Sequence, residues 1–124
     1  MGGKTLLLAE DEMYVAMTLS DLLTEAGYRV LTAARLGDAI GVAERERIDC
    51  AILDINLHGE QVYPLCDRLR ESGVPFFFTS AYGAEGLADE YRDVPMVPKP
   101  YTCDEVVEAI VRQMDGTADG TQAR

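Results

Sequence analysis

Short apolar runs alternate along the chain with longer stretches in which apolar residues recur at helical spacing. The apolar runs occupy residues 5–9, 29–33, 50–53, 74–78 and 96–97. Continuous runs of this kind are typical of strands buried on both faces, whereas the stretches between them are typical of amphipathic helices. Five strands alternating with five helices predict an α/β doubly wound fold, in which a five-stranded parallel sheet is covered by helices on both sides.

Most of the expected helices carry a clear apolar stripe that should face the sheet. The stripes comprise Val15, Leu19, Leu22 and Ala26, then Leu36, Ala39, Ile40 and Ala43, then Val62, Leu65, Cys66 and Leu69, and last Val106, Val107, Ile110, Val111 and Met114. A further short helix is expected over residues 84–92, where the pattern is weak. Thr102 and Glu105 have the spacing of a capping box, which predicts the start of the last helix.

Length and charge exclude several classes of protein. The 124 residues fit one domain, expected over residues 1–116 and followed by a small, polar, flexible tail over residues 117–124. The net charge of −11 would repel phosphate backbones, so we expect no nucleic-acid partner. The apolar runs are too short to span a bilayer and the N-terminus has no signal-peptide pattern. We therefore expect a cytoplasmic protein with no membrane partner.

Cysteine and histidine offer little for a metal site or a histidine-based triad. Cys50, Cys66 and Cys103 are widely spaced and form no Cys-x-x-Cys pair. The first two are expected in the core, and the third is expected to have a structural role in the first turn of the last helix. His58 is the single histidine, and we expect it to be an exposed loop residue.

Polar residues instead gather just past the expected strands. Glu10, Asp11 and Glu12 follow the first strand, and Asp54 follows the third. Thr79 and Ser80 end the fourth strand, and Lys99 with Pro100 follows the fifth. Doubly wound sheets bind ligands outside the carboxyl ends of their strands, so these side chains should meet at one edge. Glu12 is expected to favour the start of a helix through the helix dipole rather than to bind a ligand.

The residue types at this edge predict phosphoryl-transfer chemistry. Crowded carboxylates repel one another unless a hard cation neutralises them, and oxygen ligands of this kind suit Mg²⁺. A carboxylate beside the metal is able to act as a nucleophile and form an aspartyl-phosphate. The charge of a transferring phosphoryl group needs a cation and a hydroxyl donor as well. Asp54, Lys99 and Ser80 match these three roles.

The motifs LLLAEDE, AILDINLHGE, PFFFTSAYG and PKPY stand in the order and roughly the spacing of one known family. Over residues 4 to about 114 the chain resembles a CheY-like receiver domain of bacterial response regulators, which has a flavodoxin-like (βα)5 fold. The resemblance implies that Asp54 accepts phosphate from a histidine kinase, with Lys99 paired to the phosphoryl group and Ser80 as the switch hydroxyl. It also implies Mg²⁺ bound directly by Asp11 and Asp54, with Glu10 acting through water and Asn56 lending its backbone carbonyl. The Lys99–Pro100 bond is commonly cis in that family.

The chain departs from the family pattern at two places. Gly59 follows Asp54 by five residues instead of the usual six, so that loop is one residue short. Met96 stands where a switch tyrosine or phenylalanine is common, which leaves Tyr82 and the loop to Gly86 as the expected movable part. The segment PFFFTSAYG is also similar to the Phe-Ala-Thr-Gly-Tyr motif of some alphaproteobacterial single-domain receivers, whose partners are often HWE-type kinases.

Several functions are compatible with these motifs, and they differ in how well they account for the residues present. The leading interpretation is a stand-alone receiver that regulates a protein partner and catalyses only its own phosphotransfer and autodephosphorylation. A phosphate shuttle or sink in a phosphorelay, or a receiver segment of a larger hybrid kinase or regulator, remains open. A phosphatase of the haloacid-dehalogenase class would need a second acid two residues after Asp54, where this chain has Asn56. A phosphate-independent adaptor fits poorly with a complete acidic site.

Overall fold

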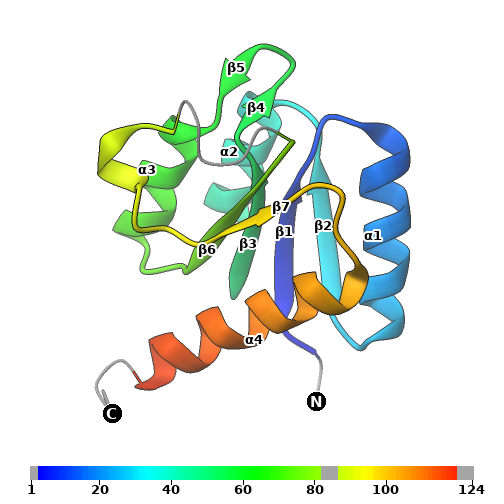
Figure 1. The fold of residues 1–124 in the computed structure, drawn as a ribbon. Coiled ribbons are helices and arrows are strands. Elements are labelled where there is room, and N and C mark those ends of the chain that lie inside the picture. The colour runs from blue at the N-terminus through cyan, green and yellow to red at the C-terminus, as the bar shows by residue number, and fades with distance from the viewer. Residues whose placement is uncertain (1–2, 82–86, 120–124) are drawn as a thin grey trace.

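A computed structural model describes residues 3–81 and 87–119 and contains a main sheet of five parallel strands (Figure 1). Their order across the sheet is β2-β1-β3-β6-β7, and every neighbouring pair is parallel. The strands are β1 (Thr5–Ala9), β2 (Arg29–Ala33), β3 (Cys50–Asp54), β6 (Phe76–Ser80) and β7 (Met96–Pro98). The predicted parallel, doubly wound sheet is confirmed.

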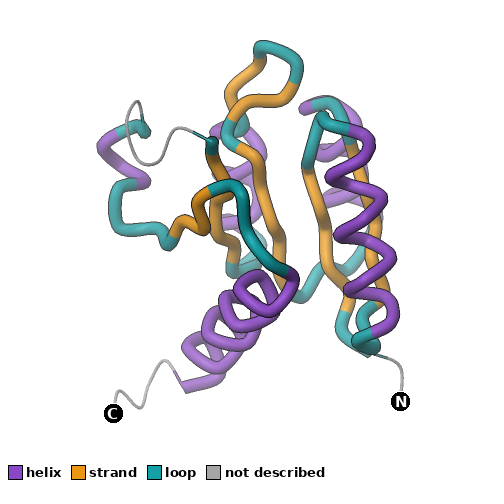
Figure 2. Tube along the Cα trace, turned by 45° about the vertical axis from the view of Figure 1, so that its right-hand side comes forward, coloured by secondary structure: helices purple, strands orange, loops and turns teal. Residues whose placement is uncertain are grey.

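Helices cover both faces of this sheet (Figures 1 and 2). Helix α1 (Met13–Glu25) contacts α4 (Cys103–Asp119) on one face, and α2 (Leu36–Arg45) contacts α3 (Tyr63–Glu71) on the other. Each face has its own apolar core, so successive residues of a strand enter different cores. In β6, for example, Phe77 packs under α1 and α4, whereas Phe76 and Phe78 pack on the α2 and α3 side.

Three positions of the predicted helical stripes are wrong. One is Ala26, which is exposed and is the C-cap residue that follows α1. Leu22 was expected in the core but is 41% exposed, and the neighbouring Leu23 is fully buried in its place. Both positions lie within one turn of Leu19, so spacing alone fits either, and the way α1 lies on β2 and α4 selects Leu23. Val111 of α4 is likewise exposed, because the helix buries Val106 and Ile110 instead.

The helix expected over residues 84–92 is not present as a helix in the part of it that the structure describes. Within residues 87–92 there is only a single 3-10 turn, η1 (Asp89–Tyr91). The turn is held by the fully buried side chain of Tyr91 rather than by an amphipathic face. The described residues therefore contain four α-helices where five were expected. Tyr82 and the rest of residues 82–86 lie outside the described ranges.

The last helix begins as predicted and runs further than expected. The backbone N–H of Thr102 donates to Glu105 Oε1 at 2.8 Å, and the N–H of Glu105 donates to Thr102 Oγ1 at 3.1 Å. These reciprocal bonds confirm the capping box. Helix α4 continues to Asp119, three residues beyond the expected domain boundary at 116, while residues 120–124 lie outside the described ranges. Each described helix is too short or too polar to cross a membrane.

A small hairpin after β3 was not predicted. Strands β4 (Asn56–Leu57) and β5 (Glu60–Gln61) pair antiparallel, and the two-residue turn between them is His58-Gly59. Both turn residues have positive φ, 51° for His58 and 86° for Gly59, as a type I′ hairpin turn requires. The backbone N–H of Val62 donates to the Ile55 carbonyl at 2.8 Å and closes the base of the hairpin.

Substitution of the capping residue should lower the stability of the fold measurably. Thr102→Ala removes the acceptor for the Glu105 N–H, and we expect it to reduce the free energy of unfolding by about 1 kcal/mol. Thr18→Ala is the matched control, because Thr18 is an exposed residue inside α1 where alanine favours the helix. Urea unfolding followed by circular dichroism measures both variants. Equal stabilities of the two variants would show that the capping box contributes nothing.

Candidate functional site

The carboxyl ends of the strands bring three carboxylates together. Glu10 and Asp11 follow β1, and Asp54 ends β3, so all three lie at one edge of the sheet. One oxygen from each lies within 4.8 Å of the others. We call these three residues the acidic cluster. The predicted meeting of these side chains is thereby confirmed.

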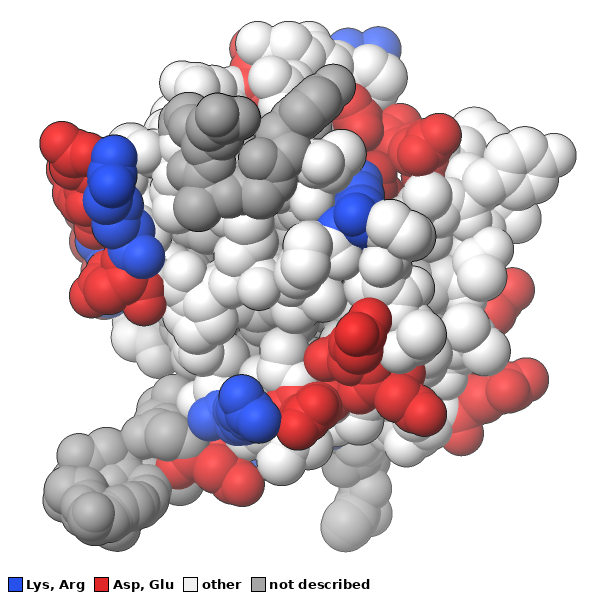
Figure 3. Space-filling model, viewed as in Figure 1, with Lys and Arg blue, Asp and Glu red and all other residues white. Residues whose placement is uncertain are grey.

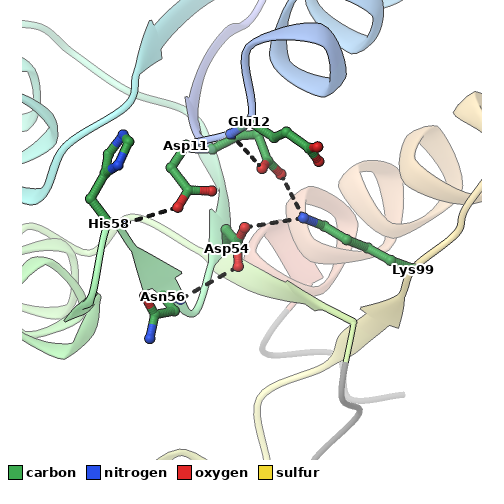
Figure 4. Close-up of polar contacts among 7 residues, drawn as sticks. Asp11, Glu12, Asp54, Asn56, His58 and Lys99 are labelled. Atoms are coloured by element: carbon green, nitrogen blue, oxygen red, sulfur yellow. Dashed lines mark hydrogen bonds and ion pairs between the residues drawn. The ribbon is translucent and has the colours of Figure 1, made fainter.

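Lys99 is the cation that pairs with this cluster (Figure 4). Its Nζ lies 3.0 Å from Glu10 Oε1 and 3.1 Å from Asp54 Oδ2. Burial by itself would lower the pKa of Lys99, but the hydrogen bonds to Glu10 and Asp54 outweigh it and raise the pKa above the usual lysine value. Lys99 is therefore held in its charged form between the ends of β1 and β3.

Glu10 is the most deeply buried member of the acidic cluster. Its side chain is 1% exposed, and its Oε2 accepts the backbone N–H of Glu12 at 3.0 Å. Burial raises the pKa of Glu10, the negative charge of Asp54 adds to the rise, and the bonds from Lys99 and Glu12 oppose it. The pKa of Tyr101 is raised to about 12, mainly because its hydroxyl is buried and in addition because the negative charge of Glu10 lies nearby. Glu12 itself is exposed at the start of α1, in agreement with the predicted helix-start role.

The unpredicted hairpin holds Asp11 from the other side. The backbone N–H of His58 donates to Asp11 Oδ2 at 2.9 Å, across 47 positions of sequence. The side chain of Asn56 is turned into the hairpin, where its Oδ1 accepts the N–H of Gly59 at 2.8 Å. The N–H of Asn56 lies 3.4 Å from Asp54 Oδ1, a longer contact than an ordinary hydrogen bond. His58 is exposed as expected, but its backbone role was not foreseen.

Ser80 and Met96 occupy neighbouring strands beside the cluster. Ser80 is buried at the end of β6, and its carbonyl accepts the backbone N–H of Lys99 at 2.9 Å. This bond ties the end of β6 to the lysine, whose peptide bond to Pro100 is cis as the family resemblance implied. Thr79 is also buried, next to Asp54 in the strand register. Met96 is half-buried in β7 and pairs in register with Phe78.

The charge of the site suits a divalent cation. Three carboxylates and one ammonium sum to a formal charge of −3 + 1 = −2, and the candidate ligands are all oxygens. Oxygen ligands in a cluster of this size are the set that Mg²⁺ prefers. The donor set of the acidic cluster therefore fits the predicted Mg²⁺.

Acidic side chains also gather over α4 on the face of the molecule in Figure 3, where a phosphate backbone would be repelled.

The three cysteines carry no comparable chemistry. Cys50 and Cys66 are fully buried, which confirms the predicted core positions. Burial raises the pKa of Cys50 to about 12, and it does the same for Cys66. Burial also raises the pKa of the half-buried Cys103, with the charge of Asp104 adding to the rise. Thiols of this kind stay protonated at neutral pH and are poor nucleophiles.

Sequence reasoning missed the backbone donors of the site. The role of the His58 N–H became visible only once the hairpin was placed, although Gly59 is by itself a general signal for a turn. No residue type near Glu10 predicts the hydrogen bond that the Glu12 N–H donates to it.

A family model described as the response regulator receiver domain matches residues 6–111. The transcriptional regulatory protein TcrA of Mycobacterium tuberculosis is 31% identical over 116 residues, which cover 86% of this chain and 44% of TcrA. The chain spans about half the length of the curated relatives it matches.

Solved receiver domains have the same fold. A CheY-like receiver domain protein from Methanospirillum hungatei superposes with a TM-score of 0.86 at 19% identity, covering 96% of this chain and 99% of the other. The receiver domain of the sensor histidine kinase PA1611 from Pseudomonas aeruginosa gives 0.78 at 24% identity, covering 91% and 98%, and is described with a magnesium ion in its active-site cleft. The family match over residues 6–111, together with an acidic cluster and a paired lysine at the strand ends, shows that this chain belongs to the response-regulator receiver domain family.

Proposed function

We propose that this receiver is a phosphorylation-dependent switch in which Asp54 accepts a phosphoryl group from a histidine kinase or a phosphotransfer protein. The observation that carries the proposal is the position of Asp54, whose Oδ2 is held by Lys99 at 3.1 Å beside two further carboxylates. A carboxylate in this setting has a cation ready to neutralise the oxygens of an incoming phosphoryl group.

The transfer step follows from the contacts of Asp54. Among the residues that the structure describes, its Oδ1 makes one hydrogen-bond contact, at the long distance of 3.4 Å, with the Asn56 N–H, so we take this oxygen as the one that attacks phosphorus. A bond forms between the carboxylate oxygen and phosphorus, and the bond from phosphorus to the donor's imidazole nitrogen breaks, leaving its electron pair on the nitrogen. Lys99 stays protonated through this step and stabilises the charge of the phosphoryl oxygens.

Mg²⁺ would be held by the acidic cluster. Asp11 and Asp54 are the direct ligands in this proposal, Glu10 acts through water, and Asn56 contributes its backbone carbonyl. When bound, the ion supplies charge neutralisation during phosphoryl transfer. Support comes from the oxygen-only cluster within 4.8 Å and from the magnesium ion described for the PA1611 receiver.

The wider setting of the switch is a proposal of the same kind. The similarity of PFFFTSAYG to the Phe-Ala-Thr-Gly-Tyr motif of single-domain receivers supports an HWE-type kinase as the phosphodonor and a stand-alone receiver that acts on a protein partner. Catalysis would then be limited to the domain's own phosphotransfer and dephosphorylation. A receiver segment of a longer kinase is the second candidate, because the PA1611 neighbour is such a segment.

The phosphoacceptor is tested by labelling. Wild-type protein incubated with Mg²⁺ and acetyl phosphate should gain the mass of one phosphoryl group, whereas Asp54→Asn should gain none, because the amide is a poor nucleophile. Asp38→Asn is the control, since Asp38 is an exposed acid in the first turn of α2. Intact-protein mass spectrometry and circular dichroism give labelling and folding together. Stoichiometric labelling of folded Asp54→Asn at another residue would overturn the assignment.

The metal site is tested by thermal melts in EDTA and in Mg²⁺. At a hundredfold excess over its dissociation constant, Mg²⁺ should stabilise the wild type by about 2.7 kcal/mol. Asp11→Asn should raise Tm in EDTA, because it removes one of three crowded charges and retains an acceptor for the His58 N–H. The same variant should reduce the shift caused by Mg²⁺, because a direct ligand is weakened.

Lys99→Ala provides the opposite arm of this experiment. It should lower Tm in EDTA, because the buried Glu10 carboxylate loses its ion pair, a loss worth up to about 3–5 kcal/mol. An Asp11→Asn protein that is less stable than the wild type in EDTA and keeps the full Mg²⁺ shift would place Asp11 outside any metal site.

A further inference from the structure

One residue of the β4–β5 hairpin has a backbone conformation that side chains disfavour. His58 has a φ of 51°, and among the residues that the structure describes it is the only non-glycine residue with positive φ. A Cβ crowds the left-handed backbone, and β-branched side chains tolerate it least, so such a residue persists only where its surroundings fix it. Positions of this kind are concentrated at functional sites. We call His58 and Gly59 the hairpin turn.

The hairpin turn stands on a fixed base. Leu57 and Val62, on either side of it, are fully buried in the core on the α2 and α3 side. Within the hairpin, the Asn56 side chain accepts the N–H of Gly59 at 2.8 Å. The position of the His58 N–H is therefore set by the path of the chain and by the side chain of Asn56.

Asp11 is the member of the acidic cluster that this N–H restrains. Lys99 forms its ion pairs with Glu10 and Asp54, and Asp11 forms none with any described residue. Figure 4 shows Lys99 and His58 on opposite sides of the cluster. Repulsion from two neighbouring carboxylates acts on Asp11, and the His58 N–H, 2.9 Å from its Oδ2, opposes it. Loss of this bond would let the Asp11 side chain turn away from the other two.

The restraint comes from the backbone of residue 58 rather than from its ring. The side chain of His58 is exposed, and its ring points away from Asp54 in Figure 4. Within the described ranges, the atoms that gather as candidate metal ligands belong to carboxylates, not to the imidazole. Any residue that accepts positive φ should therefore serve at this position. Glycine and asparagine accept it readily, whereas valine does not.

We infer that the hairpin turn is a positioning element of the divalent-cation site, in which the backbone of His58 holds Asp11 within the acidic cluster. The inference rests on the Mg²⁺ site of the proposed function. A chain whose turn is open must close it before Asp11 is in place, so the apparent dissociation constant for Mg²⁺ rises as the closed fraction falls. The coupling is reciprocal, so the ion should in turn favour the closed turn.

Titration with Mg²⁺ followed by NMR tests the inference. The Glu12 amide is the reporter, because it bonds to Glu10 in the acidic cluster. His58→Val should raise the apparent dissociation constant about tenfold, because valine resists positive φ. His58→Gly and His58→Asn should bind Mg²⁺ as the wild type does. Gln61→Val is the matched control, since it places the same side chain at an exposed strand position of the same hairpin, where valine is favourable.

Two further measurements distinguish positioning from a purely structural role. A turn that only stabilised the fold would lower the Tm of His58→Val in EDTA and leave its dissociation constant for Mg²⁺ unchanged. Amide hydrogen exchange gives the reciprocal readout. In the wild type, Mg²⁺ should slow exchange of the His58 amide at least threefold, because the ion favours the turn in which this amide bonds to Asp11.

Asn56→Ala tests the turn from within and decides the matter if circular dichroism shows that His58→Val does not fold. It removes the acceptor of the Gly59 N–H and keeps the backbone carbonyl of residue 56. The dissociation constant for Mg²⁺ should rise by up to about tenfold, the size expected for one such bond. Adding His58→Val should raise it by less than the product of the two single effects, because both substitutions open the same turn.

The outcomes separate this inference from the proposed function. No response of the wild-type Glu12 amide to Mg²⁺ would remove the metal site and the inference together, while phosphorylation of Asp54 is measured independently by mass. A normal wild-type response with unchanged dissociation constants in folded His58→Val and Asn56→Ala would overturn the inference and leave the metal site intact. A tenfold weaker affinity in His58→Gly or His58→Asn would show that the imidazole is required, and it would equally overturn the inference.

Discussion

Electrostatic repulsion within the acidic cluster is the constraint to which the rest of the site responds. Glu10, Asp11 and Asp54 lie at strand ends that a parallel sheet brings to the same edge, and their oxygens come within 4.8 Å of one another. Lys99 offsets part of that charge through two ion pairs. The remaining formal charge of −2 suits a divalent cation. It is also the reason that we expect the fold to be less stable without the cation.

Backbone N–H groups, rather than further side chains, direct these carboxylates. The N–H of Glu12 bonds to Glu10 at the entry to α1, and the N–H of His58 bonds to Asp11 from the tip of the β4–β5 hairpin. Such donors are fixed by the path of the chain, so they orient a carboxylate without adding a charge that would compete with a metal. The short loop after Asp54 contributes to the site, because its tight turn at His58 and Gly59 places the His58 N–H beside the acidic cluster.

The two faces of the sheet differ in what they hold. The α1 and α4 face is packed by aliphatic side chains around Phe77, with Tyr28 and Tyr101 packed against them. The α3 side carries the stacked rings of Tyr63 and Tyr91, and the Tyr91 hydroxyl donates to Asp67. The 3-10 turn η1 depends on these contacts, because three residues cannot form a stable helix alone.

Much of the fold could be predicted from the sequence because its signals are local. Apolar runs mark strands such as β1 (Thr5–Ala9), and the spacing of Thr102 and Glu105 marks a helix start. The residue that follows a strand is known once the strand is known. The location of the site at one edge of the sheet could also be predicted, because the carboxyl ends of parallel strands lie at the same edge. Even so, spacing alone did not separate Leu22 from Leu23, because both lie within one turn of Leu19 and only packing on neighbouring elements chooses between them.

The sequence by itself thus determined the parallel sheet, the family and the residue types gathered at one edge. Tertiary structure alone decided which backbone N–H groups bond to Glu10 and Asp11, and how Tyr91 reaches Asp67. The physical reason is range. Helix and strand patterns depend on residues a few positions apart, whereas the His58 bond to Asp11 spans 47 positions and the Tyr91 bond to Asp67 spans 24, and both exist only after the layers have packed.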